Sequence, residues 1–326
     1  MPSVNNVHVN QPLTNISIGV WQSVNSFAFN RVFATVPVNH KSDVYYKSDL
    51  AAMLRDDMRP RAPGTESAGT GYNVDTENYN IKVYSIHHDI SDQVRANADS
   101  VLSLDTTTTK WLTQMSMIRQ EKLFSSNYLS AGQWNIDVQG AASAPTTSQV
   151  LKWNDDASDP VADINSYKTR VQLAGGIRPN VLMLTQDVRD ALDTNPAIID
   201  RIKYSGGIGN DTPVVVSETA LAKVFGVEEI VVTSAIENIA AEGAPAQNRF
   251  IASGKALLVY RNRTPGLDQP TGGFRFTWKE YLNNNEGVRV KKFRMENLES
   301  DRIEVDLATD MAIAMPEVGA LFYDLV

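Results

Sequence analysis

Cysteine is absent from the 326-residue chain, and this absence excludes disulfide bonds and thiolate chemistry. It is typical of a protein that folds in a reducing compartment. Long apolar runs are also missing, because no stretch approaches the roughly 20 residues that cross a bilayer. Residues 1–15 are polar and lack the charged start and apolar block of a secretory signal. We therefore expect a cytosolic product that does not associate with membranes.

Histidine is scarce, with four in the chain, and this limits the catalytic arrangements that can form. His87 and His88 are adjacent on an expected strand, where successive side chains point to opposite faces and are poorly placed to share a metal ion. No nucleophile-elbow motif is present. The glycine cluster at 206–209 follows an expected helix and precedes an expected strand, the reverse of a phosphate-binding turn. We expect no catalytic residue, no metal and no cofactor.

Basic residues are too few and too dispersed for a nucleic-acid surface, and the formal net charge is −8. The densest basic group alternates with apolar residues and comprises Arg289, Lys291, Lys292 and Arg294. We interpret it as the solvated face of a strand. From Glu299 onward acidic residues dominate, which opposes close contact with DNA there.

Residues 160–205 carry the clearest pattern in a chain whose composition is that of a globular protein. Apolar spacing predicts a helix over 163–173, and the apolar run 181–184 predicts a buried strand. A helix over 187–192 follows, and Pro196 is placed to start another over 197–204. This stretch predicts a compact α/β layer.

The first 47 residues show little helical periodicity but carry several large apolar groups, including Trp21, Phe27, Phe29 and Phe33. Such an arm packs on its own domain, lies across a neighbouring subunit, or is a partly ordered tail.

Residues 48–90 contain a tip at 59–71 that is rich in proline, glycine and other turn residues, followed by an alternating run. Two arms of about 15 residues, at about 3.3 Å per residue, would project on the order of 50 Å. A two-stranded hairpin is marginal in water, so we expect it to rest on another surface. An ordinary surface hairpin is the alternative.

The remainder predicts a long helical region over 91–129, with Glu121 among the polar complement of its apolar stripe. A second compact unit is expected to begin after Ser205, with strands at 214–216, 230–233, 256–260 and 274–278. Residues 288–295 and 303–307 alternate and predict a long antiparallel pair.

The segments 163–164, 175–184, 191–192, 195–204, 256–260 and 273–278 resemble, in this order, those of tailed-bacteriophage major capsid proteins. The resemblance implies an α+β Hong Kong 97-type fold. It implies an N-terminal arm at 1–47, an extended loop at 48–90, and a peripheral domain with a long spine helix at 91–205 and 288–326. Residues 206–287 would form the axial domain, whose loops meet at the centre of each ring of subunits.

By the same resemblance, copies of the chain form pentamers and hexamers of an icosahedral virion shell, assembled in the host bacterial cytoplasm. The shell encloses double-stranded DNA without sequence-specific binding. The candidates for contacts between subunits are Phe27, Phe29, Phe33, Arg59, Arg61, Pro63, Gly64 and Glu66. The arm is too short to include a scaffolding segment, so we expect a separate scaffolding protein, a portal and possible decoration proteins.

Some capsid families join subunits through a lysine on the extended loop. This chain has no lysine between Lys47 and Lys82, and arginine stays protonated, so we expect no covalent cross-link. Two alternatives stay open. One is an encapsulin-type compartment with the same fold and a protein cargo, and the other is a soluble α/β enzyme.

Overall fold

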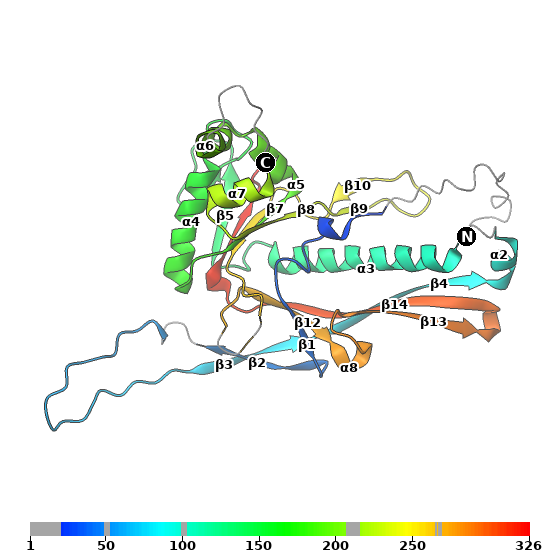
Figure 1. The fold of residues 1–326 in the computed structure, drawn as a ribbon, viewed down its shortest axis with the longest axis horizontal. Coiled ribbons are helices and arrows are strands. Elements are labelled where there is room, and N and C mark those ends of the chain that lie inside the picture. Colours follow the sequence, from blue (N-terminus) through cyan, green and yellow to red (C-terminus); the bar gives the residue numbers. More distant parts are fainter. Residues whose placement is uncertain (1–20, 49–52, 99–102, 207–215, 265, 267–268) are drawn as a thin grey trace.

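The computed structural model describes residues 21–48, 53–98, 103–206, 216–264, 266 and 269–326. Two large β-sheets and the long helix α3 (Leu104–Tyr128) organise this part of the chain (Figure 1). One sheet has six strands in the order β6-β5-β15-β11-β7-β8. The other has the order β1-β12-β14-β13, with β4 paired to β14 as its fifth strand. Within the described residues, no helix has both the length and the apolar character to span a bilayer.

The six-stranded sheet supplies the larger of the cores and is packed against four helices (Figure 1). Its strands are β5 (Ile136–Ala141), β6 (Gln149–Leu151), β7 (Val181–Thr185), β8 (Glu229–Thr233), β11 (Ala256–Val259) and β15 (Gly319–Tyr323). The helices are α4 (Pro160–Gly175), α5 (Gln186–Thr194), α6 (Pro196–Gly206) and α7 (Glu218–Phe225). All five residues of β7 are buried, and the first four are the apolar run that predicts a buried strand.

Helix α4 shows how the local sequence sets these elements. The Asp159 carboxylate accepts hydrogen bonds from the backbone N–H groups of Val161 and Ala162 at 3.2 and 3.1 Å, which caps the first turn. Gly176 ends the helix at φ 71°, a left-handed conformation that favours glycine. The helix, strand and two further helices predicted between residues 163 and 204 are present as α4, β7, α5 and α6, which confirms the prediction.

The prediction that a second compact unit begins after Ser205 is wrong. Strand β7 pairs in parallel with β8 and antiparallel with β11, so one sheet crosses the expected boundary. Ile198, Leu221 and Leu258 share one hydrophobic core. Of the strand expected at 214–216, Val216 lies outside any strand and the other two residues fall outside the described part of the chain.

The five-stranded sheet lies along α3, with Leu112 of the helix packed in one cluster with Ile90, Ile303 and Val305 (Figure 1). Its strands are β1 (Thr35–Val38), β4 (Lys82–Ser91), β12 (Gly273–Trp278), β13 (Val288–Met295) and β14 (Ser300–Ile313). The predicted antiparallel pair is confirmed, since β13 and β14 pair in continuous register. The smaller elements are η2 (Val24–Ser26), β2 (Ser42–Ser48), β3 (Val74–Asn80), α2 (Asp92–Asn97), β9 (Ile236–Asn238), β10 (Asn248–Phe250), α8 (Lys279–Leu282), η3 (Glu296–Leu298) and η4 (Pro316–Val318).

The basic residues of β13 are neutralised by acids of β14 and α3. Arg289 and Lys291 contact the buried carboxylate of Asp306 at 3.0 and 2.5 Å. Lys292 contacts Asp105 at 2.7 Å. The basic residues of β13 therefore lie on both faces of the strand, and carboxylates of the same chain engage the cations on each face. These residues do not present an unpaired row of cations to a phosphate backbone.

Asp306 predicts an acid-dependent loss of stability. Burial disfavours its ionised form, but hydrogen bonds from Lys291, Ser85 and Arg289 outweigh this and lower its pKa to about 2. Because an aspartate has a pKa of about 3.9 in the unfolded chain, the contribution is present above about pH 4 and is lost between about pH 4 and 2. We expect Asp306→Asn to lower the free energy of unfolding at pH 7 by about 2 kcal/mol. Denaturant titrations at pH 7, 4 and 3 check this, and an equal pH dependence in the variant would contradict it.

Candidate functional site: the extended loop and the pocket at its base

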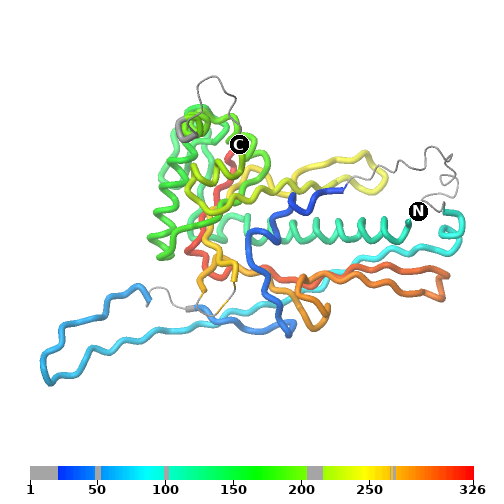
Figure 2. Tube along the Cα trace, in the orientation of Figure 1, coloured from blue at the N-terminus to red at the C-terminus, as the bar shows by residue number. Residues whose placement is uncertain are grey.

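The connection between β2 and β3 projects away from the body of the molecule as an open loop (Figure 2). The two seven-residue strands at its base pair from Ser42–Asn80 to Ser48–Val74. The described residues beyond them, 53–73, form no strand. The expected hairpin arms of about 15 residues are thus too long, because prolines and glycines remove the donors and side chains that a ladder needs.

The outer end of the loop holds five of the predicted contact residues, and all five are exposed: Arg59, Arg61, Pro63, Gly64 and Glu66. A turn orders this end, since the N–H and the hydroxyl of Thr65 donate to the carbonyl of Ala62 at 3.2 and 2.8 Å. The Thr70 hydroxyl donates to the Asp57 carboxylate at 2.7 Å and so links the outgoing and returning segments of the loop. The loop therefore has local order of its own, but its contact residues point into solvent.

Large apolar side chains on the loop are also exposed. Met58 is 92% exposed, Tyr72 66% and Leu54 62%. Each such side chain left in water forgoes roughly 1.5–3 kcal/mol of burial energy. Exposed apolar groups along a projecting segment are typical of a surface that a partner covers.

The arm beyond residue 20 differs from the loop in that its large apolar side chains at Phe27, Phe29 and Phe33 are buried. Phe27, Phe29 and Phe33 are 0%, 6% and 3% exposed within their own chain. The ring of Phe33 packs on that of Tyr128 in α3, with centroids 4.6 Å apart. Because their apolar surface is buried in the chain's own core, these three phenylalanines leave little surface for the contacts between subunits that the sequence analysis predicts for them.

Glu121 of α3 fixes the arm in this position. Its carboxylate accepts hydrogen bonds from the N–H groups of Ala28 and Phe29 at 2.9 and 3.0 Å, and from the Thr233 hydroxyl at 2.6 Å. Burial raises the pKa of Glu121, and these hydrogen bonds only partly offset the rise. The sequence analysis assigned Glu121 to the polar side of the helix. The spacing of apolar residues does not distinguish a buried glutamate of this kind from a solvated one.

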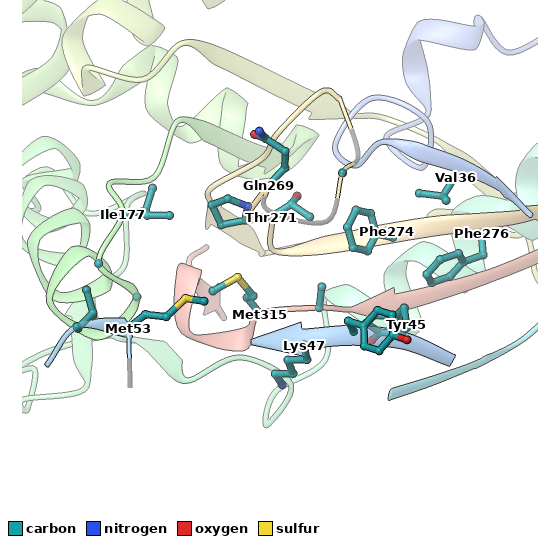
Figure 3. A pocket seen from close by; sticks show the side chains of 17 residues that line it. Val36, Tyr45, Lys47, Met53, Ile177, Gln269, Thr271, Phe274, Phe276 and Met315 are labelled. Atoms are coloured by element: carbon teal, nitrogen blue, oxygen red, sulfur yellow. The ribbon is translucent and has the colours of Figure 1, made fainter. Parts of the chain in front are cut away.

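A cavity of about 560 Å³ lies at the base of the loop, and Figure 3 shows its side chains. Strand β2 contributes Tyr45 and Lys47, and the start of the loop contributes Met53. The other labelled lining residues are Val36, Ile177, Gln269, Thr271, Phe274, Phe276 and Met315. Most of this lining is apolar, and among the described lining residues none is a carboxylate or a histidine. The cavity therefore suits apolar groups.

The paired histidines lie on opposite faces of β4, as predicted. His87 is opposite Glu304 in the sheet, whereas the ring of His88 packs edge-on to Trp111 of α3 with centroids 5.5 Å apart. Within the described residues, no three side chains of histidine, aspartate or glutamate are grouped as they would be around a metal ion.

No protein-family model matches the chain. The major capsid protein of Burkholderia phage BcepMu is 24% identical to it over 230 residues, which span 68% of this chain and 69% of that protein.

Solved structures agree with the fold over nearly the whole chain. A phage-related protein from Bordetella bronchiseptica superposes with a TM-score of 0.67 at 19% identity, over 93% of this chain and 94% of that one. The capsid of cyanophage P-SCSP1u gives a TM-score of 0.60 at 10% identity, over 94% and 90% of the two chains. The SrpI encapsulin of Synechococcus elongatus gives 0.54 at 13% identity, over 96% and 93%.

The chain has the α+β Hong Kong 97-type fold of shell-forming proteins, which confirms the predicted fold class. Within that class, its sequence is similar to a phage major capsid protein, and the similar structures include the capsids of cyanophage P-SCSP1u and bacteriophage PhiM1. The predicted resemblance to phage major capsid proteins is thus confirmed.

Proposed function

We propose that this chain is the major capsid protein of a tailed phage, with a structural rather than a catalytic role. Many copies assemble into the closed icosahedral shell of the virion, which encloses double-stranded DNA. The observation that carries the proposal is the extended loop, which projects from the body of the described chain and exposes apolar and charged side chains to solvent.

The loop at 48–90 overlaps a neighbouring subunit in this proposal, and the subunits form pentamers and hexamers. The six-stranded sheet with α4–α7 forms the part of the subunit grouped around the ring axis. The five-stranded sheet together with α3 forms the periphery. The corrected boundary supports this division, because β8 and β11 share a sheet and a core with β7, which precedes the expected boundary.

The proposed partners are other copies of the chain, a separate scaffolding protein, a portal and decoration proteins. The DNA inside contacts the shell without sequence-specific recognition. The ion pairs of β13 support this, since its cations are already engaged by carboxylates of the same chain.

An encapsulin compartment is the second candidate, supported by the shared fold. A gene neighbourhood without terminase and portal genes would favour it. A soluble enzyme would elute as a small oligomer in size-exclusion chromatography.

Negative-stain microscopy of the expressed protein, alone and with a candidate scaffolding protein, tests the proposal. Closed shells of uniform size are expected. A homogeneous monomer or small oligomer under both conditions would overturn it.

Cross-linking gives a separate prediction. Because residues 48–81 contain no lysine, assembled shells boiled in detergent are expected to release a single band near 35.9 kDa. A persistent ladder of larger bands in denaturing electrophoresis would show covalent bonds between subunits and refute the prediction.

A further inference from the structure

Three arginines gather around one glutamate where the arm passes the start of β8. Arg261 and Arg263 each place a guanidinium nitrogen on the same Glu229 oxygen, at 2.6 and 2.7 Å. Arg31 of the arm lies 4.0 Å from the other Glu229 oxygen. A single carboxylate thus serves three cations.

The charges in this arginine cluster do not balance. Glu228, the neighbouring acid, accepts a hydrogen bond from the Asn180 amide at 3.2 Å and pairs with none of the three arginines. With Glu228 included, three positive charges face two negative ones in the part of the chain that the structure describes. The side chain of Arg261 is only 6% exposed, and its Nε has no hydrogen-bond partner. Arg263 is 75% exposed and presents the excess charge to solvent. Among the described residues, the cluster therefore carries one excess positive charge.

The extended loop carries a carboxylate that has no cationic partner among the described residues. Asp56 accepts a hydrogen bond from the Met58 N–H at 3.1 Å, and Asp57 accepts one from Thr70 at 2.7 Å. Glu66 is exposed and, within the described residues, forms no hydrogen bond or ion pair. It lies on the projecting end of the loop, where a second molecule can reach it.

We propose that the arginine cluster binds the Glu66 carboxylate of a second copy of this chain through Arg263. The inference rests on the proposed shell function, which supplies the second copy. An arginine and a carboxylate form a directional, charge-assisted pair. A contact between two different surfaces of identical subunits is heterologous and closes into rings when the rotation allows.

A DNA phosphate is the other anion that this chemistry accepts. One excess charge at one point differs from the row of cations with which proteins neutralise a phosphate backbone. Charge complementarity therefore favours a side chain of a second copy.

A charge exchange tests the inference in shells assembled from the full chain. We expect Arg263→Glu and Glu66→Arg each to reduce the yield of closed shells about tenfold, because each places like charges in contact. The double variant restores the attraction and is expected to return within about twofold of the unaltered protein. Glu66 is exposed and unpaired among the described residues, and the pair of Arg263 with Glu229 is a surface pair, which contributes little to stability. The unassembled variants should therefore keep the circular dichroism spectrum of the parent and a melting temperature within about 5 °C of it.

The matched control combines Arg263→Glu with Glu242→Arg, which changes an exposed glutamate on the β9–β10 connection and should not rescue assembly. Single variants that assemble normally, or a double variant no better than the singles, would overturn the inference while the shell function stands. Normal shells that lose only their DNA in Arg263→Glu would overturn it in favour of phosphate binding. Failure of the unaltered protein to form shells would instead overturn the proposed function.

Discussion

Replacing residues 56–71 by a short Gly-Ser linker is expected to abolish shell formation and to leave the unassembled chain folded. Almost all side chains in this range are exposed, and its hydrogen bonds, such as Thr70 to Asp57, stay within the loop. The two sheets and their cores do not include it. Its removal should therefore change the free energy of unfolding of the monomer little. In the shell, by contrast, every subunit loses the same contact with its neighbour.

Sedimentation velocity and electron microscopy measure shell formation, and thermal unfolding of the unassembled chain measures the fold. A matched control replaces residues 241–245 of the β9–β10 connection, another exposed segment, with the same type of linker. Intact shells from the loop variant would contradict the prediction. A collapse of its melting temperature would show that the loop serves the monomer instead.

Removing the Glu121 carboxylate has the second large expected effect. Glu121→Ala leaves the N–H groups of Ala28 and Phe29 and the Thr233 hydroxyl buried without their acceptor. Each unsatisfied buried group costs about 1–3 kcal/mol, and relief from burying a charge offsets part of the total. We expect the free energy of unfolding to fall by about 2–4 kcal/mol, and by less in Glu121→Gln, which keeps one acceptor oxygen.

Denaturant titration checks the magnitude, and hydrogen exchange locates the effect. Exchange should accelerate most in residues 23–34, because the carboxylate ties this part of the arm to α3. Lys110→Ala, an exposed change on the same helix, serves as the control and should alter neither measurement by much. A loss below about 1 kcal/mol in Glu121→Ala would show that the arm is held by its aromatic packing alone.

The local elements were largely predictable because their signals lie within a few residues of one another. The α4–α6 stretch combined apolar spacing with a first-turn proline at Pro196, and both signals act locally. The cap at Asp159 was not predicted, and the helix begins at Pro160 rather than at residue 163. The projecting loop was also visible in its proline and glycine content. Its unpaired outer part was not, because composition does not say where a ladder stops.

The errors share a physical origin in contacts between residues far apart in the chain. Strands β7 and β8 pair across more than 40 residues, so the expected boundary at Ser205 could not reveal one continuous sheet. Phe33 was recognised as apolar, but only the fold shows that Tyr128 covers it. Glu121 is polar in sequence and buried in the structure, because two backbone donors from a distant segment meet it.

Protection of the loop on assembly tests the central claim most directly. Trypsin added to unassembled chains should cut rapidly after Arg55 and Arg61, since both lie exposed on the loop. The same bonds in assembled shells should resist cleavage by at least about tenfold, because a neighbouring subunit covers them. Equal cleavage rates in the two states would mean that the loop stays in solvent after assembly, and the account would fail.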